Sequence, residues 1–412
     1  MADAVEDFRR RILRLDAGAE KILDAVEADP DNGEVLICAA ILHLYGQTAA
    51  DERAAVGYLD RAEAAGAGSG AFFAALRRWA GRDHEGAASA LEEETFANPM
   101  NLFAAKICEF LYYILGQQHC GARFLKHMER LAPHHPENPD FLSMRSFAAE
   151  LCGHFDDARG WAEASLERET RNPWAEHTLS HVLIRQGQID EGGRRLRSFL
   201  PVAATCARPI HSHTAWHLAL FELEHLELRN AEEILRSDIW GVVPDMTGEQ
   251  IDAIALLWRL EMAGGSAEGI WSDIADHAVT GVGDFFMPFL TAHRVYALAR
   301  TGRTEDLAAM ERSMGEAKLS PVWNRMGFAL VRAARAAGER RWSDAAKWMD
   351  PIIGNLTEAG GSDAQDDLFR QMYFFALVES GLRADAKNYL DRFLGDKARS
   401  PLDRRFERLT SH

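Results

Sequence analysis

A glycine that ends an apolar helical segment recurs along this chain of 412 residues at nearly constant spacing. Gly46, Gly81, Gly116, Gly153 and Gly187 are separated by 35, 35, 37 and 34 residues. A repeat of this length is typical of helical hairpins that stack one on the next. The spacing therefore predicts that residues one repeat apart lie side by side on neighbouring hairpins.

The pattern continues through the second half of the chain at Gly264, Gly302, Gly338 and Gly381, with one gap. In that gap we expect a turn without glycine at residues 228–230. Alternating β-branched segments are absent, whereas Ala, Leu, Glu and Arg recur at helical spacing. Together with the Asn-Pro pairs between repeats, these features resemble tetratricopeptide repeats. We expect an all-α fold, a right-handed α-solenoid of about ten hairpins that curves into a superhelix.

No low-complexity linker divides the sequence, which predicts a single domain over residues 1–412. Within it we expect N-terminal hairpins over residues 1–70 and core repeats with histidine motifs over 71–240. C-terminal repeats with a Gly-Gly-Ser loop are expected over 241–412.

The charge and the cysteines restrict the classes of partner. Lys and Arg total 46 against 63 Asp and Glu, a net charge of −17, which disfavours nucleic-acid binding. The five cysteines are scattered without a Cys-x-x-Cys pair, as is typical of reduced thiols. No segment resembles a signal peptide, and no apolar run reaches the roughly 18 residues of a membrane span. We expect a soluble cytoplasmic protein with no membrane partner.

Four histidines form two pairs that match the repeat. His177 and His181 are four residues apart on one predicted helix, and His213 and His217 follow 36 residues later with the same spacing. Residues four apart share a helix face, so the repeat predicts one patch of four imidazoles. Glu224 lies seven residues after His217, about two turns along the same face.

Three interpretations of this patch remain open. The histidines pack between helices, or they bind a metal ion, or they line a pocket for a polar ligand. Neither histidine pair carries the glutamate that follows the first histidine of a zinc protease, so we assign no metal ligand and leave the cofactor unknown. Further candidates for ligand contact are Trp174, Trp216, Glu222 and His293, although each tryptophan also suits core packing.

The late loop that begins at Gly360-Gly361 precedes another predicted helix. Ser362 followed by Gln365 is a capping-box pattern, which satisfies the first N–H groups of a helix. The alternative is that Ser362, Asp363 and Gln365 face the cavity and bind an anionic or carbonyl group.

Three segments together resemble the tetratricopeptide repeat protein 38 family. Residues 174–182 are similar to its W-A-x-H-x-x-x-H-V stretch, residues 213–224 to its H-x-x-W-H-L-A-L-F-H-L-E, and residues 360–369 to its G-G-S-H-A-Q-R-D-V-F. The order and separations agree from about residue 70 to about residue 385. The resemblance implies that the four histidines, Glu224, Ser362 and Gln365 are family features. This chain differs where Glu222 and Asp363 replace histidine, Asp366 replaces arginine, and Ile184-Arg185 replaces a Glu-Met pair, which makes the cavity more acidic.

The sequence therefore predicts a concave pocket that binds a small polar ligand. If the protein is an enzyme, His177, His181, His213, His217 and Glu224 are its candidate acid–base residues, in hydrolase or lyase chemistry. The alternative is a scaffold, without catalysis, that binds a protein or a peptide along its groove. The expected partner is a small polar molecule or a peptide, with a homodimer left open.

Overall fold

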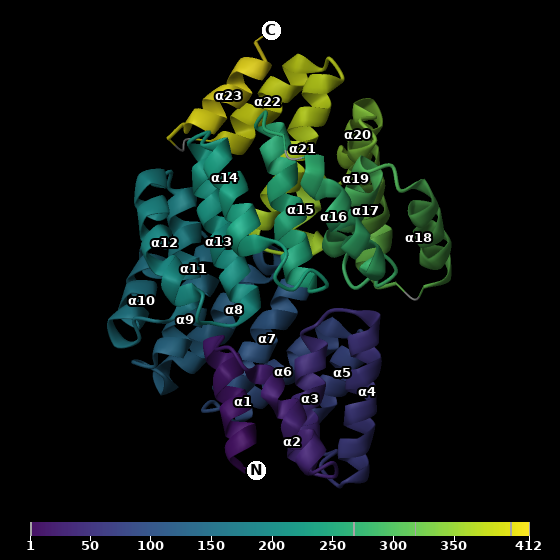
Figure 1. The fold of residues 1–412 in the computed structure, drawn as a ribbon. Coiled ribbons are helices and arrows are strands. Elements are labelled where there is room, and N and C mark those ends of the chain that lie inside the picture. The colour runs from purple at the N-terminus through teal and green to yellow at the C-terminus, as the bar shows by residue number, and fades with distance from the viewer. Residues whose placement is uncertain (1, 267, 318, 396–397, 412) are drawn as a thin grey trace. The chain divides into compact units, whose positions relative to one another are not determined.

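The computed structural model describes residues 2–266, 268–317, 319–395 and 398–411 (Figure 1). In these ranges every regular element is a helix, and the β-type contact is an isolated bridge between Asp16 and Cys206. The predicted all-α fold of successive helical hairpins is therefore confirmed. No helix in the described ranges has the length and apolarity that crossing a membrane requires.

The chain divides into two compact units. Unit 1 contains residues 1–179 and 201–210, and unit 2 contains residues 180–200 and 211–412. The expectation of a single domain stays a prediction. The helices before the first boundary are α1 (Ala2–Arg14), α2 (Ile22–Ala28), α3 (Gly33–Leu44), α4 (Ala49–Ala64), α5 (Ala71–Ala80), α6 (His84–Ala97), α7 (Leu102–Leu115), α8 (Gln117–Leu131), α9 (Pro139–Leu151) and α10 (Phe155–Arg168).

The boundaries fall within α11 (Pro173–Arg185), α12 (Ile189–Ala203) and α13 (Arg208–Glu224). The remaining helices lie in unit 2: α14 (Leu228–Ile234), α15 (Thr247–Met262), α16 (Glu268–Ala278), α17 (Pro288–Arg300), α18 (Thr304–Glu316), α19 (Phe328–Gly338), α20 (Trp342–Met349), α21 (Asp363–Glu379), α22 (Arg383–Leu394) and α23 (Pro401–Leu409). Two short π-helical segments, Leu235–Ile239 and Trp323–Gly327, adjoin α14 and α19.

The predicted glycine turns separate the helices of the hairpins. Gly153 ends α9 with φ of 77°, and Gly187 follows α11 with φ of 71°, a left-handed conformation that glycine adopts without strain. After α13 the left-handed residue is Leu226, with φ of 62°. The turn without glycine therefore precedes residues 228–230, which already belong to α14.

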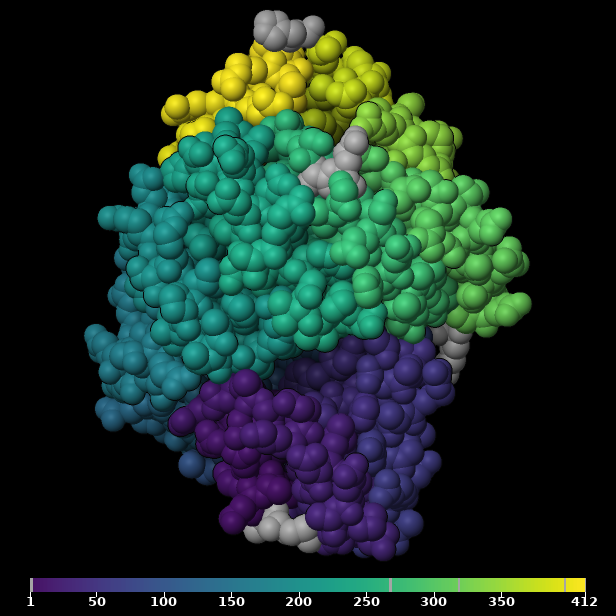
Figure 2. All heavy atoms as spheres, in the orientation of Figure 1, coloured from purple at the N-terminus to yellow at the C-terminus, as the bar shows by residue number. Residues whose placement is uncertain are grey.

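The core of unit 2 near the site consists of side chains from α11, α12 and α13. Leu183, Ile189, Leu196, Leu218 and Phe221 form one buried apolar cluster there. Helix α15 packs against both α17 and α21, so α21 contacts a helix that begins more than a hundred residues earlier. In Figure 2 the teal to green residues of unit 2 form a continuous surface on the face drawn.

Candidate functional site

Three of the four predicted histidines lie in a row within unit 2. His181 is on α11, and His213 and His217 are on α13. The ring centroids of His181 and His217 are 4.8 Å apart, and those of His213 and His217 are also 4.8 Å apart. His181 and His217 are one repeat apart in sequence, so the repeat places them side by side as predicted. The prediction that His177 lies beside His213 concerns residues of different units and stays a prediction.

Carboxylates from later helices hold the two ends of this row. Nδ1 of His181 lies 2.8 Å from Oδ1 of Asp363, at the start of α21. Nδ1 of His213 lies 3.0 Å from Oδ1 of Asp252, on α15. Since each carboxylate accepts from a ring nitrogen, it fixes the orientation of that imidazole. The order across the site is therefore Asp363, His181, His217, His213 and Asp252.

Asp363 is a buried charge with a histidine and an arginine beside it. Its side chain is 5% exposed, and Oδ2 lies 3.4 Å from Nη1 of Arg185. Burial raises the pKa of Asp363, but the neighbouring His181 and Arg185 lower it by a larger amount. The net pKa therefore lies well below the ordinary value for aspartate. Asp363 is therefore ionised at neutral pH, which a buried carboxylate tolerates only when it is paired.

A cavity of about 220 Å³ opens beside this pair. Its wall contains residues of α11, α13, α15, α21, α22 and α23, all in unit 2. The charged and polar members are Arg185, Glu224, Arg259, Asp363, Asp367 and Gln371. The apolar members are Ile184, Leu220, Leu223, Ala364, Phe393, Leu394 and Leu402. Asp363 and Glu224 were predicted for the site and line this cavity, whereas none of the four histidines is among its lining residues.

Arg259 is the cation on the α15 side of the cavity. It is 4% exposed, and Nη2 donates to the carbonyl of Ala364 at 2.7 Å. Its guanidinium also lies 5.2 Å from the ring centroid of Trp216. Burial lowers the pKa of Arg259 to about 10, and Asp367 and Glu224 partly oppose that shift. Arg259 therefore stays charged at neutral pH inside a largely apolar environment.

The loop before α21 is a helix cap. The backbone N–H of Ser362 donates to Oε1 of Gln365 at 3.0 Å, and the N–H of Gln365 donates to Oγ of Ser362 at 3.4 Å. Both side chains are buried, and neither lines the cavity. The capping-box interpretation is therefore the one the geometry supports, and of the loop residues Asp363 contributes to the cavity wall.

Trp216 and His293 are both fully buried. Trp216 stacks on His213 with centroids 5.1 Å apart. Nδ1–H of His293 donates to the carbonyl of Phe289 at 2.8 Å, and its ring contacts Phe369. Burial lowers the pKa of His293 to about 3, so the ring is neutral. Neither residue lines the cavity.

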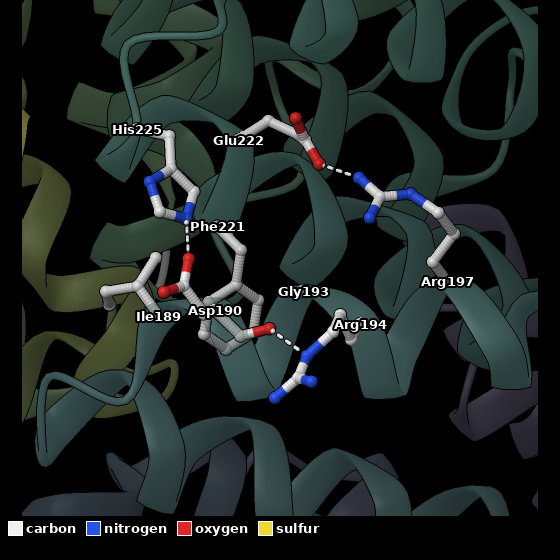
Figure 3. A pocket seen from close by; sticks show the side chains of 8 residues that line it. All are labelled: Ile189, Asp190, Gly193, Arg194, Arg197, Phe221, Glu222 and His225. Atoms are coloured by element: carbon white, nitrogen blue, oxygen red, sulfur yellow. Dashed lines mark hydrogen bonds and ion pairs between the residues drawn. The ribbon is translucent and has the colours of Figure 1, made fainter.

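Glu222 lies in a second, more open groove of about 440 Å³ between α12 and α13 (Figure 3). It accepts hydrogen bonds from Arg197 and from Nδ2 of Asn230. On the other side of the groove, Nε2 of His225 lies 3.1 Å from Oδ1 of Asp190. Glu222 therefore faces away from Glu224, because residues two apart on a helix point in different directions.

Trp174 and His177 lie in unit 1. The two rings stack with centroids 4.4 Å apart, and Trp174 Nε1 donates to Oε1 of Glu109 at 2.8 Å. Nζ of Lys106 lies 4.2 Å from the Trp174 ring and 2.6 Å from Oε2 of Glu109. Lys106, Glu109 and His177 are buried and Trp174 is partly buried. A catalytic or ligand-binding role for His177 and Trp174 stays a prediction.

Four residues near the site were not predicted from the sequence, namely Asp252, Arg259, Asp367 and Gln371. Arg259 carried the clearest signal, because it interrupts the apolar run Ile254-Ala255-Leu256-Leu257-Trp258 of α15. A charge at such a position is buried with the helix and needs compensation from outside it.

No family model matches the chain. Among solved structures, that of Naa15/Naa10 bound to HypK-THB is similar to 97% of this chain, with 13% identity and a TM-score of 0.26. The similarity covers 64% of that chain, so this chain spans less than two thirds of the length of the protein it matches. At this TM-score the likeness carries no argument about activity or partners.

Proposed function

We propose that unit 2 binds a small polar ligand in the cavity lined by Asp363 and Arg259. The observation that carries the proposal is the pairing of a buried carboxylate and a buried guanidinium on the wall of one cavity. Asp363 is held by His181, and Arg259 is held by the carbonyl of Ala364. Polar groups fixed in this way are pre-organised to orient a ligand, and the apolar members of the wall supply contact area.

The size of the cavity favours a metabolite over a peptide. Its volume of about 220 Å³ is below the roughly 300–1,000 Å³ of sites for drug-sized molecules. Six apolar side chains besides Ala364 line it, which supplies contact area for a compact organic body.

A catalytic form of the proposal uses proton transfer. Asp363 would meet the ligand, and His181 would hold or release the proton from behind, since His181 is fully buried and does not line the cavity. Asp252 would orient His213, at the end of the histidine row away from Asp363.

A thermal-shift screen with a panel of metabolites tests the proposal. We expect some compounds to raise the melting temperature of the full chain and to lose that effect in Asp363→Asn. Asp245→Asn is the matched control, because Asp245 forms a histidine pair of the same 2.8 Å length with His277 at the surface. If every hit acts equally on the parent, Asp363→Asn and Asp245→Asn, the cavity is not the binding site.

A peptide-binding scaffold is the second candidate function. The observation that favours it is the open groove of Figure 3, which presents Arg194, Arg197 and Asp190 to the same opening. Binding of a peptide that is lost in Arg197→Gln but kept in Asp363→Asn would support this function over the first.

Membership of the tetratricopeptide repeat protein 38 family and a cytoplasmic location remain proposals. The first depends on the three sequence segments, two of which meet where Asp363 pairs with His181. The second depends on the five free cysteines.

A further inference from the structure

Arg259 has no carboxylate within ion-pair distance among the described residues. A guanidinium has five N–H donors. Those of Arg259 make two hydrogen bonds, both to backbone carbonyls, namely of Ala255 at 3.4 Å and of Ala364 at 2.7 Å. Carbonyl oxygens satisfy donors but do not neutralise a full charge, so the buried cation lacks a paired anion.

Another buried arginine of unit 2, Arg294, provides a comparison, because its partners all lie within the chain. Arg294, on α17, is 2% exposed and donates to Gln250, Gly281 and Thr247. Its Nη1 also lies 3.7 Å from Oδ2 of Asp284. Arg294 lines neither of the two cavities described, whereas Arg259 lines the one beside Asp363. The difference indicates that Arg259 is left to pair with a group from outside the chain.

Apart from Arg259, Arg185 and Gln371, the residues of the cavity wall are acidic or apolar. Glu224 and Asp367 line it and are the largest electrostatic influences that raise the pKa of Arg259 against its burial. Asp363 is already paired with His181 and Arg185. A ligand that brought only negative charge would meet these carboxylates, and an uncharged ligand would leave Arg259 unpaired.

We propose that the ligand is a zwitterion of the amino-acid type with an apolar side chain. Its carboxylate pairs with Arg259, its ammonium group faces Glu224 and Asp367, and its side chain lies against Leu220, Leu223 and Phe393. The proposal rests on the proposed function, because it names the ligand class of that cavity. A free amino acid carries both charges on one carbon, which a peptide terminus does not.

Calorimetric titration of the full chain with L-leucine, L-methionine and L-phenylalanine tests the ligand class. Each binding amino acid is compared with its N-acetyl derivative, which lacks the cation, and its amide, which lacks the anion. We expect at least one amino acid to bind at millimolar concentration or below, and each blocked form to bind about tenfold or more weakly, as for loss of a charge-assisted hydrogen bond.

Variants assign the two charges to their residues. In Arg259→Gln the amide is expected to bind as well as the amino acid, because the carboxylate has lost its partner. In the double variant Glu224→Gln with Asp367→Asn, the N-acetyl form is expected to bind as well as the amino acid. Arg236→Gln is the control for loss of an exposed arginine, with side-chain exposure of 56%, and is expected to preserve the parent's order of affinities.

The outcomes distinguish the zwitterion proposal from the more general proposal that the cavity binds a small polar ligand. Equal binding of the free and blocked forms, or no binding of any of the three amino acids, overturns the zwitterion assignment. If another class of metabolite then binds in a manner that depends on Asp363, the pocket remains and only its ligand class was wrong. The blocked-ligand comparison needs only the parent chain, so it stands even if Arg259→Gln fails to fold.

Discussion

Nδ1 of His181 lies 2.8 Å from Oδ1 of Asp363, although 182 residues separate them in sequence. This pair joins the C-terminal half of α11 to the first residue of α21 within unit 2. Both side chains are at most 5% exposed. The contact brings the C-terminal end of α11 next to the N-terminal end of α21, and residues of both ends line the cavity.

The first prediction concerns the stability that the Asp363 pair contributes. Asp363→Asn keeps the shape but removes the charge that His181 and Arg185 face. Removing the buried carboxylate removes a charge-assisted hydrogen bond, which contributes about 1.5–3 kcal/mol to stability. We expect a loss of that order in the free energy of unfolding, measured by urea denaturation.

The surface pair of Asp245 with His277 is its control. That pair has the same N–O distance of 2.8 Å, but the Asp245 side chain is 74% exposed. Asp245→Asn should therefore change stability by less than about 1 kcal/mol. Equal losses in the two variants would show that the Asp363 pair behaves as a surface pair.

The second prediction separates a cap from a ligand contact at Ser362. Ser362 and Ser400 both form capping boxes, at the starts of α21 and α23. Each serine-to-alanine substitution should cost about 0.5–2 kcal/mol, measured by urea denaturation. Since Ser362 does not line the cavity, Ser362→Ala should keep the ligand affinity of the parent, as Ser400→Ala should. An affinity loss specific to Ser362→Ala would place its hydroxyl on the ligand instead.

The third prediction concerns the close packing at Gly361. This glycine has φ of +88°, and a Cβ there would lie 3.0 Å from the Phe289 ring. Gly381 has a similar φ of +78° with nothing within 4 Å of the added Cβ. Gly381→Ala should cost about 1–2 kcal/mol through backbone conformation alone. Gly361→Ala should cost more in the same urea measurement, and equal costs would show that the Phe289 contact relaxes freely.

The fourth prediction is a pH dependence that arises from His293. Burial lowers its pKa to about 3 in the folded protein, below its ordinary value of about 6.5. As pH falls below about 6.5, the unfolded chain therefore binds a proton that the folded chain does not. Stability should fall with pH through this window, by about 1.4 kcal/mol per pH unit for this histidine.

His293→Leu should remove that contribution. Urea denaturation between about pH 6.5 and pH 4 should give a shallower dependence of stability on pH for the variant. The exposed His119 provides the control, and His119→Gln should keep the slope of the parent. If His293→Leu keeps that slope as well, His293 is not neutral in the folded protein.

The sequence repeat predicted the side-by-side placement of His181 and His217, because residues at matching positions of neighbouring hairpins are adjacent. Glu224 was predicted for the same face of α13 as His217, and it lines the cavity, whereas His217 does not. These inferences depend on local helix geometry, which can be predicted from the spacing of residues in the sequence.

The contact with Asp363 had no such local signal, and the sequence around Arg259 indicates a buried charge but not the groups that it contacts. Which later helix packs beside α11 depends on how many hairpins separate them and how each turn rotates its neighbour. Glu222 illustrates the same limit at short range, because its partners Arg197 and Asn230 draw it into the groove of Figure 3. The repeat alone therefore does not predict which distant helices pack together or which charged side chains pair.

A crystal structure of the full chain with a compound selected by the thermal-shift screen is the most direct measurement. We predict ligand density in the cavity between α13, α15 and α21, within hydrogen-bond distance of the Arg259 guanidinium and beside the Asp363 carboxylate. Density for the compound in the groove at Glu222, with only water beside Arg259, would contradict the account.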